Sequence, residues 1–323
     1  MTEQPTLAQV AAAAGVSPAT ASRVLTGSVR VSTSTRRQVY DAVSRMGYVR
    51  HRAPRGTSAG TMTDGVTAVV CDHLPRLFSE PYYARLLSAA GNVIAEHGTH
   101  LMVTTVSPAS ATLPALSGSV LIVGARERHP LAIKLSTSGM PVRGIGRPPH
   151  DLKLPFADVD NRDGGRQAAE HFLLTGRRTI AAIGGPPSLP GARDRLEGLV
   201  RTLQAAGLPD VPVAYGDFTA ASGVHAMQWL LRHAPGVDAV FAASDLMAAG
   251  AIQALRRAGR KVPTDVAVIG FDDAPVARQT VPTLTTVRQP VEELATVATR
   301  LLLTGAGGVD PVLPTELVVR ESA

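Results

Sequence analysis

The stretch that decides the fold is LAQVAAAAGVSPATASRVLTG, residues 7–27. Its apolar residues recur at helical spacing until Gly15, a residue suited to the left-handed end of a helix. Ser17 is then a good N-cap and Pro18 a good first helical residue, because the N–H that proline lacks has no partner in a first turn. The stretch therefore predicts two short helices around a glycine turn, the helix-turn-helix arrangement that lays its second helix in the major groove of DNA.

The formal charge of the chain is concentrated in the same region. Residues 1–60 carry eight arginines, no lysine and two acids, and eight minus two equals the +6 of the whole 323-residue chain. The remaining residues therefore balance to zero. A basic N-terminal domain on a neutral body is the charge pattern of a DNA-binding protein, and the apolar helical core distinguishes it from an unspecific basic tail.

The composition indicates a globular chain of two or three domains. Apolar residues make up 45% and charged residues 18%, while aromatic residues are only 4%, so the core must rest on Ala, Val, Leu and Ile. The single cysteine, Cys71, excludes an internal disulfide and a cysteine-rich zinc site, and we expect a buried, inert thiol. The chain has no run of 18 apolar residues and begins with a polar stretch, so we predict a cytoplasmic protein without signal peptide or membrane span.

Three regions follow one another along the chain. Residues 1–50 form the predicted DNA-binding domain, which a third helix ending near Gly47 completes; residues 51–64 form a hinge linker; and residues 65–323 form the body. In the body, short apolar runs alternate with amphipathic helical stretches. Strands are predicted at 66–71, 100–106, 119–123, 142–145, 157–159, 179–183, 211–214, 239–243 and 266–271, and helices at 82–97, 164–175, 194–207, 219–232, 245–259 and 291–303.

This alternation predicts an α/β body with parallel sheets. Two series of four or five strands indicate two doubly wound subdomains with a crevice between them. Ligands in such folds bind at the carboxyl ends of the strands.

The motifs that would indicate an enzyme fail on their context. The G-x-S-x-G pattern at residues 56–60 lies in the polar linker, without the buried strand that a nucleophile elbow needs. Gly144-Ile145-Gly146 opens like a dinucleotide fingerprint, but Pro149 stands where the third glycine belongs. No histidine has the spacing of a metal ligand set. We therefore expect neither an enzyme nor a metal or cofactor.

Along nearly its whole length the chain resembles the LacI/GalR family of transcriptional regulators. The matching motifs are residues 7–27, VSTSTRRQVYDAVSRMGYV at 31–49, VDNRDGGRQAAEHFLLTGRRTIAAIGG at 159–185, FAASDLMAAGAIQALRRAGRKVPTDVAVIGFDD at 241–273 and PTLTTVRQP at 282–290. The resemblance implies a homodimer whose paired heads bind a near-palindromic double-stranded operator. It also implies a periplasmic-binding-protein-like core for a small effector, dimerisation through that core, and crossovers between its subdomains near 158–161 and 287–291.

The resemblance also assigns roles in the head. Pro18, Ala19 and Arg23 match the base-reading positions; Arg23 is suited to a bidentate contact with guanine, worth about 1–3 kcal/mol of discrimination. The two other residues offer only apolar contact. Hydroxyls suited to phosphate contacts, for which capping or solvent exposure is the alternative, belong to Thr6, Ser17, Thr20, Ser22, Ser32 and Thr35.

In the body, the resemblance implies an effector site formed by Phe78, Arg195, Phe218, Ser244, Asp245, Asp272 and Gln289. Arg195 and Asp272 are suited to charge-assisted hydrogen bonds with hydroxyls or a carboxylate. Phe218 falls where the family places an aromatic side chain that stacks on the ligand.

Three departures from the family pattern alter these expectations. In the linker, Pro54 and Gly56 oppose a hinge helix and Thr57 replaces the leucine wedge, so we predict a weak hinge helix with Arg52 and Arg55 contacting the groove electrostatically. Residues 107–118 replace a longer helix that often lies near the dimer interface. An acidic effector contact and an asparagine of the family are replaced by Gly146 and Ser244.

The sequence thus predicts an effector-controlled transcriptional repressor, with a sugar or sugar phosphate as the effector. A nucleobase corepressor is the alternative ligand. The competing class is a transport-type solute-binding protein, which would need a signal peptide and would not need the helix-turn-helix domain.

Overall fold

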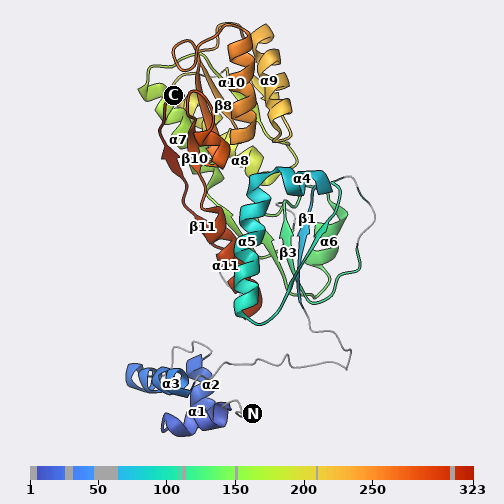
Figure 1. Cartoon of the computed structure of the whole chain (residues 1–323), viewed down its shortest axis with the longest axis vertical. Helices are drawn as coiled ribbons and strands as arrows, with labels where there is room; N and C mark the ends of the chain where they lie inside the picture. The colour runs from blue at the N-terminus through green and yellow to red at the C-terminus, as the bar shows by residue number, and fades with distance from the viewer. Residues whose placement is uncertain are drawn as a thin grey trace. The chain divides into compact units, whose positions relative to one another are not determined.

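The computed structural model describes residues 6–25, 32–46, 65–108, 110, 114–149, 152–208, 210–305 and 310–323. The chain divides into two compact units, Met1–Thr61 and Met62–Ala323 (Figure 1). The division falls in the predicted linker. The hinge helix and the linker residues Arg52 and Arg55 lie outside the described residues.

The N-terminal unit contains the two helices around a turn that the sequence predicts. Its helices are α1 (Leu7–Ala13), α2 (Pro18–Leu25) and α3 (Thr33–Met46). The turn between α1 and α2 contains Gly15 at φ +65°, the left-handed conformation for which glycine is suited. A small core holds the three helices together, and its fully buried side chains include Val10, Ala21, Val24 and Val39.

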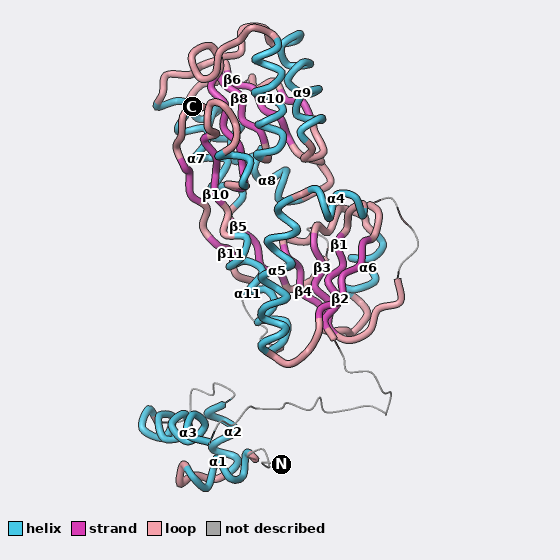
Figure 2. Tube along the Cα trace, in the orientation of Figure 1, coloured by secondary structure: helices cyan, strands magenta, loops and turns pink. Residues whose placement is uncertain are grey.

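The body contains two six-stranded sheets flanked by helices (Figure 2). The first sheet has the order β11-β5-β4-β3-β1-β2, and all of its pairings are parallel. Its strands are β1 (Val66–Val70), β2 (Leu101–Thr105), β3 (Ser119–Val123), β4 (Val142–Ile145), β5 (Phe156–Val159) and β11 (Val312–Leu313). Its helices are α4 (Leu74–Ser79), α5 (Pro81–Glu96), α6 (Pro130–Ser136) and α11 (Val291–Thr304).

The second sheet has the order β12-β10-β9-β8-β6-β7 and is parallel except for the pair of β10 with β12. Its strands are β6 (Ile180–Gly184), β7 (Val213–Tyr215), β8 (Ala239–Ala242), β9 (Ala267–Asp272), β10 (Thr285–Arg288) and β12 (Glu316–Val318). Its helices are α7 (Asn161–Leu174), α8 (Pro190–Ala205), α9 (Ala220–His233), α10 (Asp245–Arg257) and the 3-10 turn η1 (Pro275–Arg278). The predicted fold class, a helix-turn-helix domain followed along the chain by two parallel-sheet subdomains, is confirmed.

The chain passes between the two sheets three times: after β5, after β10, and between β11 and β12. The first two crossings lie where they were predicted, near 158–161 and 287–291, whereas the third was not predicted. Strands of two and three residues are too short to show periodicity, so β11 and β12 escaped prediction. Three connecting segments therefore join the two subdomains.

Helices α4 and α6 were not predicted, and α7 and α8 begin earlier than expected. The side chain of Asp160 caps α7 by accepting a hydrogen bond from the N–H of Asp163 (2.9 Å), and Pro190 opens α8. The described residues of 107–118 form turn and irregular backbone, without the longer helix of the family. None of the described helices combines the length and apolarity of a bilayer crossing.

Two glycines allow α7 and α8 to pack closely. A Cβ on Gly165 would collide with the carbonyl oxygen of Arg195, and one on Gly198 would collide with the carbonyl oxygen of Arg162. Glycines inside helices lower intrinsic helix stability. Here they bring the backbone of α8 against α7 at the turn that carries Arg195.

Cys71 is buried, as expected for an inert thiol. Burial raises its pKa to about 12, so the nucleophilic thiolate is unpopulated at neutral pH.

Candidate ligand-binding cleft

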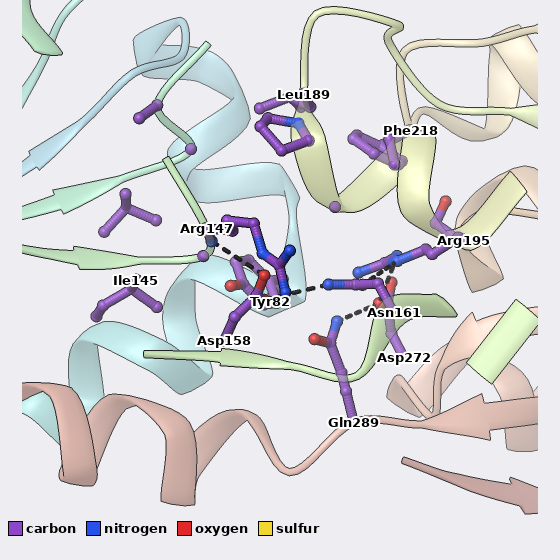
Figure 3. Close-up of a pocket in the computed structure, with 18 of the residues that line it drawn as sticks. Tyr82, Ile145, Arg147, Asp158, Asn161, Leu189, Arg195, Phe218, Asp272 and Gln289 are labelled. Atoms are coloured by element: carbon purple, nitrogen blue, oxygen red, sulfur yellow. Dashed lines mark hydrogen bonds and ion pairs between the residues drawn. The ribbon is translucent and has the colours of Figure 1, made fainter. Parts of the chain in front are cut away.

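A cleft lies between the two subdomains at the carboxyl ends of their strands (Figure 3). The space between its walls, including the open mouth, is about 790 Å³. Figure 3 shows Tyr82, Arg147 and Asp158 on one wall and Arg195, Phe218 and Asp272 on the other. Polar residues of both subdomains thus line one pocket, because the chain crosses from one sheet to the other.

Asp272 is the central carboxylate of the second wall. It ends β9 and is buried, and its Oδ1 accepts hydrogen bonds from Nη1 of Arg195 (3.3 Å) and from Nε2 of Gln289. Both of these hydrogen bonds go to Oδ1, so Oδ2 is the oxygen more available to a ligand. Burial raises the pKa of Asp272, and the Arg195 guanidinium opposes that rise.

Arg195 is held by three segments of the second subdomain. Its Nε donates to Oδ1 of Asn161 (2.9 Å), and its Nη1 donates to the carbonyl of Ala243 (2.7 Å) as well as to Asp272. The guanidinium carbon lies 3.8 Å from the centre of the Phe271 ring, a cation–π contact. The guanidinium is therefore fixed before any ligand arrives.

Asp158, at the end of β5, is the carboxylate of the first wall. Its oxygens accept hydrogen bonds from the backbone N–H groups of Arg147 (3.0 Å) and Val159 (2.8 Å) and from Nδ2 of Asn161 (3.1 Å). Burial raises its pKa, and these backbone donors oppose the rise. The Nε of Arg147, a lining residue of the cleft, is buried without a hydrogen-bond partner among the described residues.

Aromatic side chains supply the apolar part of the lining. Phe218 follows β7 in the left-handed region (φ +72°), and Tyr82 and Tyr83 lie in the first turn of α5 with their rings edge to face. The Tyr83 hydroxyl donates to Asp72 (2.9 Å). Aromatic faces beside paired carboxylates and guanidinium groups suit a ring-shaped ligand that carries hydroxyls.

The two subdomains touch each other at the mouth of the cleft. Arg76 on α4 contacts Asp72 (3.3 Å) and Glu80 (3.2 Å) on its own side and donates to the carbonyl of Asp217 across the cleft. The N–H of Glu127 donates to the carbonyl of Ser188 across the same opening (3.0 Å). Hydrogen bonds therefore join the two subdomains across the opening of the cleft.

Glu80 is an unusual acid at this opening of the cleft. Burial raises its pKa to about 8, the nearby Asp272 carboxylate adds to the rise, and Arg76 opposes it. Its neutral form therefore predominates at pH 7.

The hydroxyls of the head cap its helices. Thr6 accepts a hydrogen bond from the N–H of Gln9 (3.3 Å), Ser17 from that of Thr20 (3.1 Å), and Ser32 from that of Thr35 (3.2 Å). Exposed positions are Thr6, Ser17, Pro18, Ala19 and Ser32, and half-buried ones are Thr20, Ser22 and Thr35. Capped helix N-termini are also favourable phosphate sites, so capping and phosphate contact are compatible. The side chain of Arg23 lies outside the described part of the chain.

Comparison with known proteins identifies the family. The profile of the bacterial regulatory proteins, lacI family, matches residues 6–51, and that of the periplasmic binding protein-like domain matches residues 169–323. The HTH-type transcriptional regulator CelR of Thermobifida fusca is 42% identical over 99% of this chain and 98% of its own length. The chain belongs to the LacI family of regulatory proteins. It is accordingly a DNA-binding transcriptional regulator with an effector-binding core, and not an enzyme.

Other transcriptional regulators match this chain over nearly its full length. The regulator DegA of Bacillus subtilis (strain 168) is 31% identical over 98% of this chain and 97% of its own. A solved structure described as a transcriptional regulator CelR-cellobiose complex is 39% identical, has a TM-score of 0.74, and covers 99% of this chain and 100% of that one. The lac repressor dimer bound to operator, at 24% identity and a TM-score of 0.70 over 99% of both chains, shares the fold.

The cleft brings together five of the seven residues that sequence reasoning assigned to the LacI-family effector site: Arg195, Phe218, Ser244, Asp272 and Gln289. Phe78 is not among the lining residues, because it lies on α4 with 82% of its surface exposed. Asp245 is fully buried, and it accepts hydrogen bonds from the Thr286 hydroxyl (2.5 Å) and the Ala274 N–H (2.7 Å). It supports the loop after β9 and does not face the cleft.

Sequence reasoning missed several lining residues, chiefly Tyr82, Arg147, Asp158 and Asn161. Asp158 belongs to a predicted strand and Arg147 follows one by two positions, so the strand-end rule applied to every strand would have found them. Asp158, on the neighbouring strand β5, places an acidic side chain in the same lining as Gly146.

Proposed function

We propose that this regulator is a repressor that binds a near-palindromic operator as a homodimer, and that a carbohydrate in the cleft controls it. The observation that carries the proposal is the pair of facing carboxylates, Asp158 and Asp272, each held by hydrogen bonds beside an aromatic side chain. Carboxylate oxygens accept hydrogen bonds from sugar hydroxyls, and the apolar faces of a sugar ring pack on Phe218 or Tyr82.

The existing ion pairs of the lining arginines favour a neutral sugar over a sugar phosphate. Three arginines (Arg76, Arg147 and Arg195) face three carboxyl groups (Glu80, Asp158 and Asp272). Arg76 and Arg195 are already paired with carboxylates, so a phosphate would have to displace those partners. A neutral ligand with hydroxyls can instead donate to the carboxylates and accept from Arg147.

The relative at 39% identity is described in complex with cellobiose, which makes cellobiose and similar glucose disaccharides the first candidates. Binding between the subdomains would stabilise one closure and so change the spacing of the two DNA-binding heads. Such coupling between effector and operator is typically about 1–3 kcal/mol.

A ligand screen on the full chain tests the proposal. We expect cellobiose to raise the thermal unfolding midpoint, because a ligand at 100 times its Kd stabilises the native state by about 2.7 kcal/mol. Glucose 6-phosphate and free purines serve as comparison ligands. If purines alone raise the unfolding midpoint, the effector is a nucleobase corepressor and not a carbohydrate.

Two further measurements address the DNA side. Sedimentation equilibrium should give twice the 33.6 kDa of one chain. Selection of bound sequences from a random pool should yield a site with two inverted halves, because a twofold-symmetric dimer presents two identical heads. A monomer, or a selected site without inverted symmetry, would contradict the homodimer, and a reporter whose transcription rises with the protein would contradict repression.

A further inference from the structure

A second buried carboxylate lies directly beside the ligand-facing one. Asp273 follows Asp272, and its side chain is only 4% exposed, but it does not line the cleft. It accepts hydrogen bonds from Arg320, Arg288 (2.8 Å) and Arg278 (3.1 Å). Burial opposes its ionisation, yet the bonds from Arg320 and Arg288 hold its pKa below the ordinary value. We call Asp273 with these three residues the arginine clamp.

The backbone explains why neighbouring carboxylates take opposite directions. Asp272 has a φ of +116° and Asp273 a φ of +48°, a region that residues with a Cβ rarely adopt. Two such residues in succession persist only where the surroundings hold them. This bend directs Asp272 into the cleft and Asp273 into the clamp.

The clamp also fixes the other partner of Asp272. Arg288 and Gln289 are neighbours at the end of β10; Arg288 donates to Asp273 and Gln289 donates to Asp272. The two bonds are successive links between the end of β9 and the end of β10. Displacement of the Asp273 link would therefore also displace the Gln289–Asp272 link.

The most buried member of the clamp comes from the end of the chain. The Arg320 side chain is 14% exposed, against 43% for Arg288 and 59% for Arg278. Arg320 also donates to the carbonyl of Leu284 (2.7 Å). Ser322 secures the same tail, because its hydroxyl accepts from the N–H of Thr285 (2.8 Å) and donates to the carbonyl of Val268 (2.6 Å).

We propose that Arg320 is a positioning residue of the effector site: through Asp273 it holds the bend that presents the Asp272 carboxylate to the ligand. The C-terminal tail thereby sets the affinity of a cleft that it does not touch. This inference rests on the proposed effector site.

Substituting each clamp arginine by methionine in the full chain tests the inference, with cellobiose binding measured by calorimetry. Loss of a residue that orients a metal ligand lowers metal affinity about 10–100-fold, and by analogy we expect about a tenfold rise in the Kd of cellobiose for Arg320→Met. The exposed members should matter less, with about a threefold rise in Kd for Arg288→Met and less than twofold for Arg278→Met. Arg320→Lys, which keeps a cation near Asp273, should recover part of the affinity.

Ser322→Ala is the matched control, because it removes tail hydrogen bonds but leaves the arginine clamp in place. It should lower the unfolding midpoint without the rise in Kd. Equal affinity loss in Ser322→Ala and Arg320→Met, or no dependence on the burial of the three arginines, would overturn the positioning role.

A measurement without ligand separates this inference from the proposed function. Amide hydrogen exchange at residues 272–274 should accelerate in Arg320→Met and stay near wild type in Ser322→Ala. If the wild-type protein binds no sugar but exchange accelerates as expected, the effector proposal fails while the support of the bend by Arg320 holds. Unchanged exchange in Arg320→Met would refute the support itself.

Discussion

Arg195→Met is the substitution for which the structure makes the sharpest expectation. It removes the hydrogen bonds to Asn161, to the carbonyl of Ala243 and to Asp272, and it replaces the cation–π contact with Phe271 by an apolar one. Removing one partner of a buried, hydrogen-bonded charge pair at a binding interface costs about 2–5 kcal/mol, and we expect a loss of this order if the Arg195 guanidinium contacts the ligand. At about 1.4 kcal/mol per tenfold, even the lower end is a loss of roughly 30-fold in ligand affinity.

The same substitution should make folding stability depend on pH through Asp272. Burial already raises the pKa of Asp272, and Arg195 is the charge that most opposes the rise, so its removal raises that pKa further. A group whose folded pKa is raised adds stability below its unfolded pKa and loses it as pH rises through the folded value. The unfolding free energy that the variant loses relative to wild type should therefore grow with pH, toward about 3–5 kcal/mol where Asp272 is ionised.

Urea unfolding at pH 5 and pH 8, together with calorimetric titration of cellobiose, measures both effects. Arg201→Met is the matched control, because Arg201 lies on the same helix with 71% of its side chain exposed and pairs only with Glu197 among the ion pairs described. It should behave like wild type in both assays. A deficit for Arg195→Met that is equal at both pH values, or unchanged ligand affinity, would refute the role assigned to the Arg195–Asp272 pair.

Three other expectations follow from separate parts of the molecule. Burial raises the pKa of Glu80 from 4.5 to about 8, so wild-type stability should fall by a few kcal/mol, roughly, as pH rises from the first value to the second. Glu80→Gln should remove this part of the pH dependence in urea unfolding. An unchanged pH profile in the variant would show that Glu80 is not held neutral. Gly165→Ala should lower the unfolding free energy by more than 2 kcal/mol, roughly, and weaken ligand binding, because the added Cβ would push α8 and Arg195 away from α7. An unchanged unfolding free energy in urea would contradict the close packing. Arg23→Ala should lower operator affinity by about 1–3 kcal/mol and affinity for random DNA much less, as judged by competition binding; equal losses would make Arg23 a phosphate contact.

The parts of the fold that the sequence predicted are those with local causes. The pattern around Gly15 and the capping residues Thr6 and Ser17 act within one or two helical turns, so α1 and α2 could be predicted from adjacent residues alone. The longer strands could be predicted because buried parallel strands are continuous apolar runs. The short strands β11 and β12 depend on pairing with distant strands, and no local signal marks them.

The same distinction between local and distant causes applies to the residues assigned to the effector site. Arg195, Asp272 and Gln289 follow from motifs whose positions relative to strands and helices are regular. Phe78 and Asp245 were assigned by the same means, but the unpredicted helix α4 leaves one exposed and the loop after β9 buries the other.

By itself, the sequence determined that this protein is a helix-turn-helix regulator with a two-subdomain α/β core, because periodicity, caps and charge distribution are properties of neighbouring residues. The tertiary structure alone decided which groups share the cleft and how they ionise. Asp158 meets the backbone N–H of Arg147 only because β4 and β5 pair, and Arg320 reaches Asp273 across 47 positions of chain. Burial and charge proximity depend on such distant neighbours, and these two quantities set hydrogen bonding and pKa in the site.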